Sequence, residues 1–261
     1  MHAFARRITP LRRFVQALRV AVAVVPSARF LWDVIRNRPE GAYTMRRTGQ
    51  RVALRPRRDL QVARELVSKN AYDPPAPLRA ALASRDTLKV LDVGANIGLF
   101  SLAALHAYGA GTRVIAVEPD PHNIPLLRRN VADNAGAAVE IHEAAASTEP
   151  GVLRFESGRD HESAVVGADR AGPGVIDVQA VDFFELAAGC DLVKVDIEGG
   201  EWPLLRDARL SSLDAAGVIL EWHGPGGTGE EAAGLLGAAG FDVQLDAPFA
   251  PGVGALWAWR G

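Results

Sequence analysis

Short apolar runs alternate with longer helical segments from Leu88 onward in this chain of 261 residues. Strand-like runs separated by segments of helical spacing are typical of a parallel sheet whose connections are helices. The pattern therefore predicts an α/β fold. The clearest strand-like runs are residues 89–93, 112–118, 138–144, 191–196 and 218–222, and two closing strands are expected at 241–245 and 255–259.

The chain is expected to have three divisions. Residues 1–45 form an Arg-rich helical extension, residues 46–85 a strand-and-helix lead-in, and residues 86–261 the main domain. The strand–helix alternation breaks at about residues 150–185, where short strands lie between Gly-rich turns. This break predicts a hairpin insert within the main domain.

Charge is distributed unevenly although the formal net charge is only −2. Residues 1–60 contain 14 of the 29 Lys and Arg residues and 3 of the 31 Asp and Glu residues. A net charge near zero argues against nucleic-acid binding by the whole chain. The basic end is expected to meet an anionic surface, to meet the acidic body of its own chain, or to be simply solvated.

Residues 3–37 are predicted to be helical and partly amphipathic. One side of this segment carries four large apolar residues, Phe14, Leu18, Val22 and Val25. No run reaches the roughly 18 apolar residues of a membrane-spanning helix. The segment is therefore expected to lie on a membrane surface or to pack on the domain.

A single cysteine, Cys190, excludes an intramolecular disulfide. A chain without disulfides fits a reducing compartment. The expected location is cytoplasmic, with peripheral membrane contact through the Arg-rich N-terminus as one option.

The sharpest motif is VLDVGANIG at residues 90–98, where a strand turns into a helix. Glycines at Gly94 and Gly98 let the backbone turn tightly and approach a ligand. Ligands of open α/β sheets bind at the carboxyl ends of the strands. The motif therefore predicts a nucleotide site that includes Asp92 and Asn96.

The type of nucleotide follows from the spacing of the glycines. A dinucleotide site needs G-x-G-x-x-G for a pyrophosphate, whereas this loop has G-x-x-x-G. The carboxylate of Asp92 suits the cationic amino-acid tail of S-adenosylmethionine better than a pyrophosphate. Glu118 ends the next strand, where an acidic side chain accepts hydrogen bonds from ribose hydroxyls.

Four segments together resemble the FkbM family of methyltransferases: VLDVGANIGLFSL (90–102), VIAVEPDPHNIPLLRRNV (114–131), DLVKVDIEGGEWPLL (191–205) and VILEWH (218–223). The resemblance covers about residues 45–260. It implies a Rossmann-like class I methyltransferase fold with a seven-stranded, mostly parallel sheet and helices on both faces. It also implies S-adenosylmethionine as donor and usually an oxygen acceptor.

Carried over residue by residue, the resemblance places Asp92, Gly94, Asn96 and Gly98 in the first donor-binding loop. It makes Glu118 the ribose acid. Known acceptors of the family include sugar hydroxyls and macrolide-type polyketides. The expected function is therefore S-adenosylmethionine-dependent O-methylation of a small molecule of the sugar, glycolipid, polysaccharide or polyketide type.

The chemistry is expected at two later strand ends, which carry Asp196 and Glu198 on one strand and Glu221 and His223 on the other. A hydroxyl acceptor has to lose its proton. In one mechanism His223 or Asp196 takes the proton directly, since histidine titrates near neutrality. In the other, Asp196, Glu198 and Glu221 hold a divalent ion. The metal-free mechanism is preferred, and no metal is predicted.

Two further residues were considered, Glu201 and His161. Glu201 is explained by the dipole of the helix that it begins. His161, in the insert, is a candidate for reaching the acceptor from a loop.

Two other classes of function compete with methyl transfer. An NAD(P)-dependent oxidoreductase has a similar topology, but the third glycine and a Tyr-x-x-x-Lys pair are both missing here. A non-catalytic, membrane-peripheral scaffold that binds S-adenosylmethionine is the second alternative. No nucleic-acid partner is expected, because DIEG follows the fourth strand instead of an amino-methylating tetrad.

Overall fold

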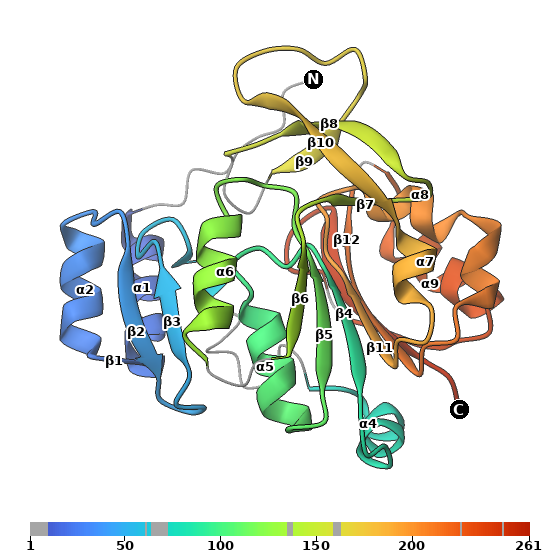
Figure 1. The fold of residues 1–261 in the computed structure, drawn as a ribbon, viewed down its shortest axis with the longest axis horizontal. Coiled ribbons are helices and arrows are strands. Elements are labelled where there is room, and N and C mark those ends of the chain that lie inside the picture. The colour runs from blue at the N-terminus through green and yellow to red at the C-terminus, as the bar shows by residue number, and fades with distance from the viewer. Residues whose placement is uncertain are drawn as a thin grey trace. The chain divides into compact units, whose positions relative to one another are not determined.

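The computed structural model describes residues 10–60, 62–63, 73–134, 138–158, 163–224, 226–246 and 248–261 (Figure 1). The chain separates into two compact units, Met1–Tyr72 and Asp73–Gly261. The division of the sequence after residues 45 and 85 stays a prediction.

The first unit combines two helices with a small antiparallel sheet. Its elements are α1 (Pro10–Ala23), β1 (Val24–Val25), α2 (Ser27–Ile35), β2 (Gly41–Met45) and β3 (Arg51–Leu54). The strand order is β1-β2-β3, and both pairings are antiparallel. The β2–β3 pair is a hairpin of which only the second strand was predicted.

Pro26 separates two helices where the sequence predicts one helical stretch over residues 3–37. A proline inside a helix lacks the amide hydrogen and clashes with the carbonyl one turn earlier. The prediction of a continuous helix is therefore wrong at this point, although both flanking segments are helical. Within the described residues, no helix combines the length and the apolar character needed to cross a bilayer.

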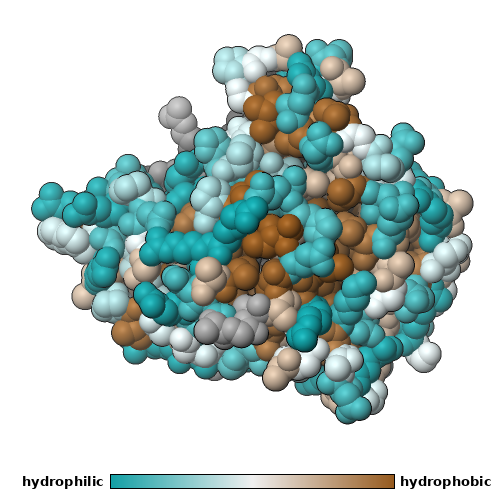
Figure 2. Space-filling view, in the orientation of Figure 1, coloured by the Kyte–Doolittle hydropathy of each residue, from teal (hydrophilic) through white to brown (hydrophobic). Residues whose placement is uncertain are grey.

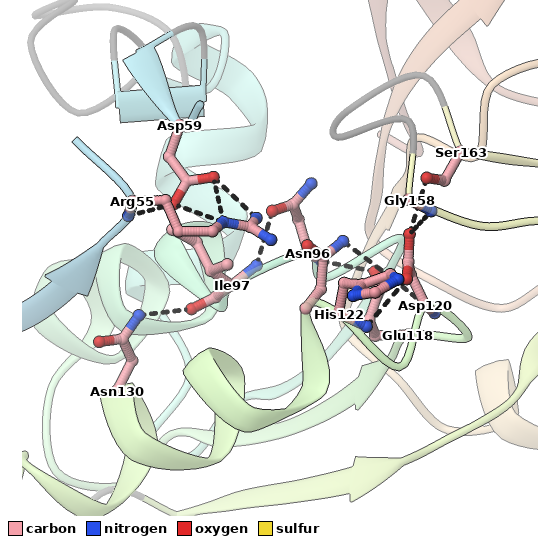
Figure 3. Close-up of polar contacts among 11 residues, drawn as sticks. Arg55, Asp59, Asn96, Ile97, Glu118, Asp120, His122, Asn130, Gly158 and Ser163 are labelled. Carbon is pink, nitrogen blue, oxygen red and sulfur yellow. Dashed lines mark hydrogen bonds and ion pairs between the residues drawn. The ribbon is translucent and has the colours of Figure 1, made fainter. Parts of the chain in front are cut away.

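A buried polar pair lies in the core of the first unit. The Tyr43 hydroxyl donates a hydrogen bond of 2.8 Å to Asp33 Oδ2. The Tyr43 ring also meets Phe30 edge-on, with 5.1 Å between ring centroids. Arg55 Nε donates to Asp59 Oδ1 at 2.9 Å (Figure 3). Most of the helix that the sequence predicts after Asp59, in the lead-in of residues 46–85, lies outside the described residues.

The second unit is built on a seven-stranded sheet of order β13-β14-β12-β11-β4-β5-β6. The five strands from β12 to β6 are parallel to one another, and β14 is antiparallel to both β12 and β13. The strands are β4 (Lys89–Val93), β5 (Arg113–Val117), β6 (Val139–His142), β11 (Leu192–Val195), β12 (Gly217–His223), β13 (Asp242–Leu245) and β14 (Val253–Trp259). The predicted α/β fold with a mostly parallel seven-stranded sheet is confirmed.

Helices cover both faces of this sheet. In Figure 1, α5 and α6 lie on one side of it, and α7, α8 and α9 on the other. The helical elements are α4 (Ala76–Ala83), α5 (Leu99–Tyr108), α6 (Ile124–Ala132), α7 (Phe183–Ala187), α8 (Glu201–Leu205), the 3-10 helix η2 (Ala208–Ser212) and α9 (Gly229–Ala238). Apolar side chains of β4, β11, β12 and the second group of helices form a continuous buried core.

The insert folds as a second sheet of order β7-β10-β8-β9 (Figure 1). Its strands are β7 (Ala145–Ser147), β8 (Gly151–Glu156), β9 (Ala164–Val166) and β10 (Val175–Asp182). β8 pairs antiparallel with both β9 and β10. Figure 2 shows apolar surface on the part of the molecule that these strands form.

Candidate active site

The loop between β4 and α5 has a left-handed backbone at three positions. Gly94, Asn96 and Gly98 have φ values of 79°, 51° and 85°. The main-chain N–H groups of Gly94 and Ala95 both donate to Val117 O at 3.0 Å, which ties the loop to the end of β5. All three predicted loop residues therefore shape one tight turn at the carboxyl end of the sheet.

Gly94 touches the end of the neighbouring strand. A Cβ atom at Gly94 would lie 1.8 Å from the backbone oxygen of Asp196. Such a distance is far inside van der Waals contact, so no side chain fits there. The loop between β4 and α5, called here the donor loop after its expected role, therefore contacts the end of β11 through backbone atoms.

Asp92 is fully buried at the end of β4. Its Oδ2 accepts a hydrogen bond of 2.6 Å from Ser101 Oγ on α5. Its Oδ1 accepts no hydrogen bond within the described part of the chain and lies 3.4 Å from Lys194 Nζ. The carboxylate therefore keeps acceptor capacity for a cationic ligand group.

Lys194 joins the two halves of the site. Its Nζ lies 3.4 Å from Asp92 Oδ1 and 3.4 Å from Asp196 Oδ2, and it donates to Gly94 O at 3.1 Å. Lys194 was not among the residues predicted from the sequence. The available signal was a lysine inside LVKV, an otherwise apolar strand, because a buried lysine is rare unless it is paired.

Glu118, the expected ribose acid, hydrogen-bonds the loop after β4. Its Oε2 accepts from Asn96 N at 2.7 Å, and its Oε1 accepts from Asp120 N at 2.9 Å and from Asn123 Nδ2 at 3.3 Å. Burial raises the pKa of Glu118 to about 7, and these hydrogen bonds oppose the rise. The side chain thus fixes the loop, and a contact to ribose would come in addition.

Asp120 ties the insert to the loop after β5, as Figure 3 shows. Its Oδ1 accepts from Ser157 Oγ at 2.7 Å and from His122 N at 2.9 Å. Its Oδ2 accepts from Gly158 N at 3.0 Å and from Ser163 Oγ at 2.7 Å. Burial alone would raise the pKa of Asp120, but these hydrogen bonds outweigh it and lower the pKa below its ordinary value.

The predicted catalytic side chains meet at the ends of β11 and β12. His223 Nε2 lies 3.3 Å from Glu198 Oε2 and 3.5 Å from Glu221 Oε1. Asp196 is held by its contact with Lys194. The structure therefore brings together all four residues proposed for catalysis, Asp196, Glu198, Glu221 and His223.

The carboxyl groups around His223 shift its pKa away from the neutral range that was expected. Its own burial lowers the pKa, but the nearby carboxyl groups of Glu201, Glu221 and Glu198 raise it to about 11. Burial raises the pKa of Glu198 to about 8, although the charge of His223 opposes this. The raised pKa favours the imidazolium form of His223, which donates hydrogen bonds.

Glu201 does more than complement a helix dipole. It is fully buried at the start of α8, and its Oε1 accepts a hydrogen bond of 2.6 Å from His223 N. Its Oε2 accepts from Gly199 N at 2.9 Å. The same Oε1 lies 3.3 Å from His223 Nδ1, so Glu201 orients the histidine from the side opposite to Glu198.

Three side chains of the cluster have the spacing of a metal site. One ligand atom each from Asp196, Glu221 and His223 lies within 4.8 Å of the other two. The set expected from the sequence had Glu198 in the place of His223. His161, the candidate in the insert, lies outside the described residues.

Comparison with known proteins decides the family. Residues 92–243, more than half of the chain, match the model of the methyltransferase FkbM domain. The chain belongs to the FkbM methyltransferase family. The site residues described above, from Asp92 in the loop after β4 to His223 at the end of β12, all lie within the matched range. The chain is therefore a methyltransferase.

Individual relatives are distant. Methyltransferase sdnD of Sordaria araneosa is 28% identical over 200 residues, which cover 62% of this chain and 77% of the relative. A crystal structure of methyltransferase FkbM from Methylobacillus flagellatus KT is 17% identical, with a TM-score of 0.47, and the match covers 78% of this chain and 54% of that one. This FkbM methyltransferase thus spans little more than half of that protein.

The change Lys194→Met tests the ion pairs of Lys194 with Asp92 and Asp196. We expect Lys194→Met to lower the free energy of unfolding by about 3 kcal/mol, because it leaves Asp92 and Asp196 without their shared cation. Lys89→Met is the control, since Lys89 Nζ makes one exposed hydrogen bond of 3.2 Å to Ala188 O. Denaturant unfolding measures both, and equal effects of the two changes would contradict the assignment.

A second prediction concerns the attachment of the insert. Asp120→Asn places N–H donors where a carboxylate oxygen accepts two hydrogen bonds, so amide hydrogen exchange in residues 151–158 and 163–166 should accelerate. Because the pKa of Asp120 is lowered, its stabilisation is present above the ordinary value of 3.8 and is lost as pH falls through the lowered pKa. The difference in melting temperature between wild type and variant should be large near neutral pH and small in acid.

Asp177→Asn is the matched control for Asp120→Asn. Asp177 lies on β10 of the same sheet and makes an exposed ion pair of 2.9 Å with Arg154. An exposed pair contributes at most about 1 kcal/mol. If the control variant loosened the insert as much as Asp120→Asn, the anchoring role of Asp120 would be wrong.

Proposed function

We propose that this FkbM methyltransferase moves the methyl group of S-adenosylmethionine to a hydroxyl oxygen of a small molecule. One observation carries the proposal. Lys194 lies 3.4 Å from the carboxylate of Asp92 in the donor loop and 3.4 Å from that of Asp196 at the end of β11. The donor-binding and proton-accepting sides of the site are thereby adjacent at one edge of the sheet.

The donor side fits the charges of S-adenosylmethionine. Asp92 Oδ1 is a buried acceptor without a hydrogen bond from the described residues, which suits the ammonium group of an amino-acid tail. Gly94, Asn96 and Gly98 would surround that tail, and Glu118 would face the ribose. When bound, the donor supplies a methyl group already activated on a sulfonium.

The acceptor side fits a hydroxyl group. A hydroxyl oxygen attacks more readily when a carboxylate within hydrogen-bond reach takes its proton. We assign this task to Asp196, whose side chain is partly exposed. His223 acts as a positioning residue, because its imidazolium holds Glu198 and Glu221 in place.

The proposed acceptors are hydroxylated natural products of the sugar, glycolipid, polysaccharide or polyketide type. The resemblance of the site motifs to the FkbM family supports this class.

The test is an acceptor screen with the full chain and isotopically labelled S-adenosylmethionine. The panel contains hydroxylated glycosides and polyketides together with amines, and the site of methylation is read by NMR. The expected product is an O-methyl ether, and a product from amines alone would overturn the assignment. A chelator arm separates direct proton transfer from transfer assisted by an ion at Asp196, Glu221 and His223.

Binding measurements separate the alternative functions. Wild-type protein should gain thermal stability with S-adenosylhomocysteine and none with NAD. The opposite result would favour the oxidoreductase. Binding of S-adenosylhomocysteine without turnover of any acceptor would favour the non-catalytic scaffold.

A further inference from the structure

Helix α1 exposes an apolar face that the described core does not use. Phe14, Leu18 and Val22 repeat every four residues, so they lie on one side of the helix, with Val15 beside them. All four side chains are exposed, and Val22 is 68% exposed. Other apolar side chains of α1, those of Ala17, Val20 and Ala21, are buried.

Helix α2 adds further exposed apolar side chains. Trp32 and Ile35 are exposed, whereas Phe30 and Asp33 on the same helix are buried. The guanidinium carbon of Arg36 lies 4.5 Å from the centroid of the Trp32 ring. An aromatic ring stacked under a cation is a pairing suited to a boundary between apolar and charged surroundings.

Arginines accompany these apolar side chains. Arg46 Nε donates to Val22 O at 3.1 Å, and its Nη2 donates to Ser27 Oγ at 2.9 Å. Arg19 and Arg29 are exposed on α1 and α2 themselves. Two of the three acidic residues before residue 61, Asp33 and Asp59, are buried, so the exposed charge of the unit is strongly positive.

We propose that the exposed apolar side chains of α1 and α2, together with the exposed arginines of the same unit, bind the surface of an anionic phospholipid bilayer; this set is called here the α1–α2 face. Helices that lie in a membrane interface bury an apolar face while Lys and Arg meet the headgroups. Each Arg near an anionic surface contributes roughly 1 kcal/mol. Trp32 would lie at the level of the headgroups.

The charge of the face also argues against a second copy of the chain as its occupant. A symmetric contact would place the arginines of one copy against those of the other, and juxtaposed like charges oppose association. An anionic bilayer matches both properties of the face at once.

Vesicle binding tests the proposal with the full chain. Vesicles of phosphatidylcholine, with and without phosphatidylglycerol, are sedimented with the protein. We expect binding only with phosphatidylglycerol, and about tenfold weaker binding for Val22→Glu. Val152→Glu is the matched control, because Val152 is 60% exposed on β8 in the other unit; this variant should bind like wild type.

Tryptophan fluorescence locates the contact. Trp202, Trp222 and Trp257 are buried and Trp259 is partly buried in the other unit, whereas Trp32 is exposed. Brominated lipids should therefore quench wild-type fluorescence, and Trp32→Phe should bind but lose the quenching. The proposal is overturned by absence of binding, by equal binding of Val22→Glu and wild type, or by light scattering that shows a dimer broken by Val22→Glu.

Discussion

Gly94→Ala should destabilise the protein by about 4 kcal/mol or more, an effect at the extreme of single substitutions. The new Cβ atom would lie 1.8 Å from the backbone oxygen of Asp196. Because the obstacle is backbone, no flexible side chain can move aside. The loop after β4 and the end of β11 would have to separate, so the folded fraction should also lose affinity for S-adenosylhomocysteine. Denaturant unfolding and calorimetry measure the two losses.

Gly109→Ala separates backbone strain from steric clash. Gly109 has φ of 85°, close to the 79° of Gly94, but a Cβ atom there meets no atom within 4 Å. A left-handed backbone costs an L-residue roughly 1–2 kcal/mol. If Gly94→Ala cost no more than Gly109→Ala, the contact between the donor loop and β11 would not be as described.

Asp196→Asn should reduce methyl transfer by about 10²- to 10⁴-fold, the range typical of the loss of a general base. The amide keeps the size of the side chain but accepts a proton poorly. Binding of S-adenosylhomocysteine should change little, because Asp92 and the loop residues stay in place. Single-turnover rates with the identified acceptor, together with calorimetry of the demethylated donor, separate chemistry from donor binding.

Asp242→Asn is the control for Asp196→Asn. Asp242 is an exposed carboxyl residue on β13 of the same sheet, and its neutralisation should leave turnover unchanged. A variant Asp196→Asn that turned over at the wild-type rate would remove the carboxylate from the mechanism. A large loss of donor affinity with unchanged chemistry would make Asp196 a donor-binding residue instead.

The parallel sheet was predictable because buried strands leave apolar runs in the sequence. Lys89–Val93 and Leu192–Val195 were found for that reason, and the helices between them follow from spacing. The strand β2 was missed, because its five residues follow an Arg-rich helical segment and pair only with short neighbours. The break at Pro26 was underestimated, since apolar residues continue on both sides of it.

The sequence predicted which residues form the candidate site better than it predicted their charge states. Strand ends placed Asp92, Glu118 and Asp196 at one edge, since parallel strands align their carboxyl ends. The protonation of His223 depends on the carboxyl groups of Glu198, Glu201 and Glu221. The spacing of these residues in the sequence does not predict that all three lie around one imidazole ring. The role of Asp120 depends on an insert whose path over the sheet is set by tertiary packing.

The pairing of β4 with β11 has a consequence for how the protein reaches its native state. Lys194 reaches Gly94 O across 100 residues of chain, and the whole insert lies between them. Closing so long a loop is entropically costly and slow compared with local pairing. The ionic bridge that joins the two halves of the site cannot form until these strands have met. Maturation of the enzyme's catalytic competence should therefore coincide with the slowest step of its folding, which refolding kinetics followed by ligand capture can show.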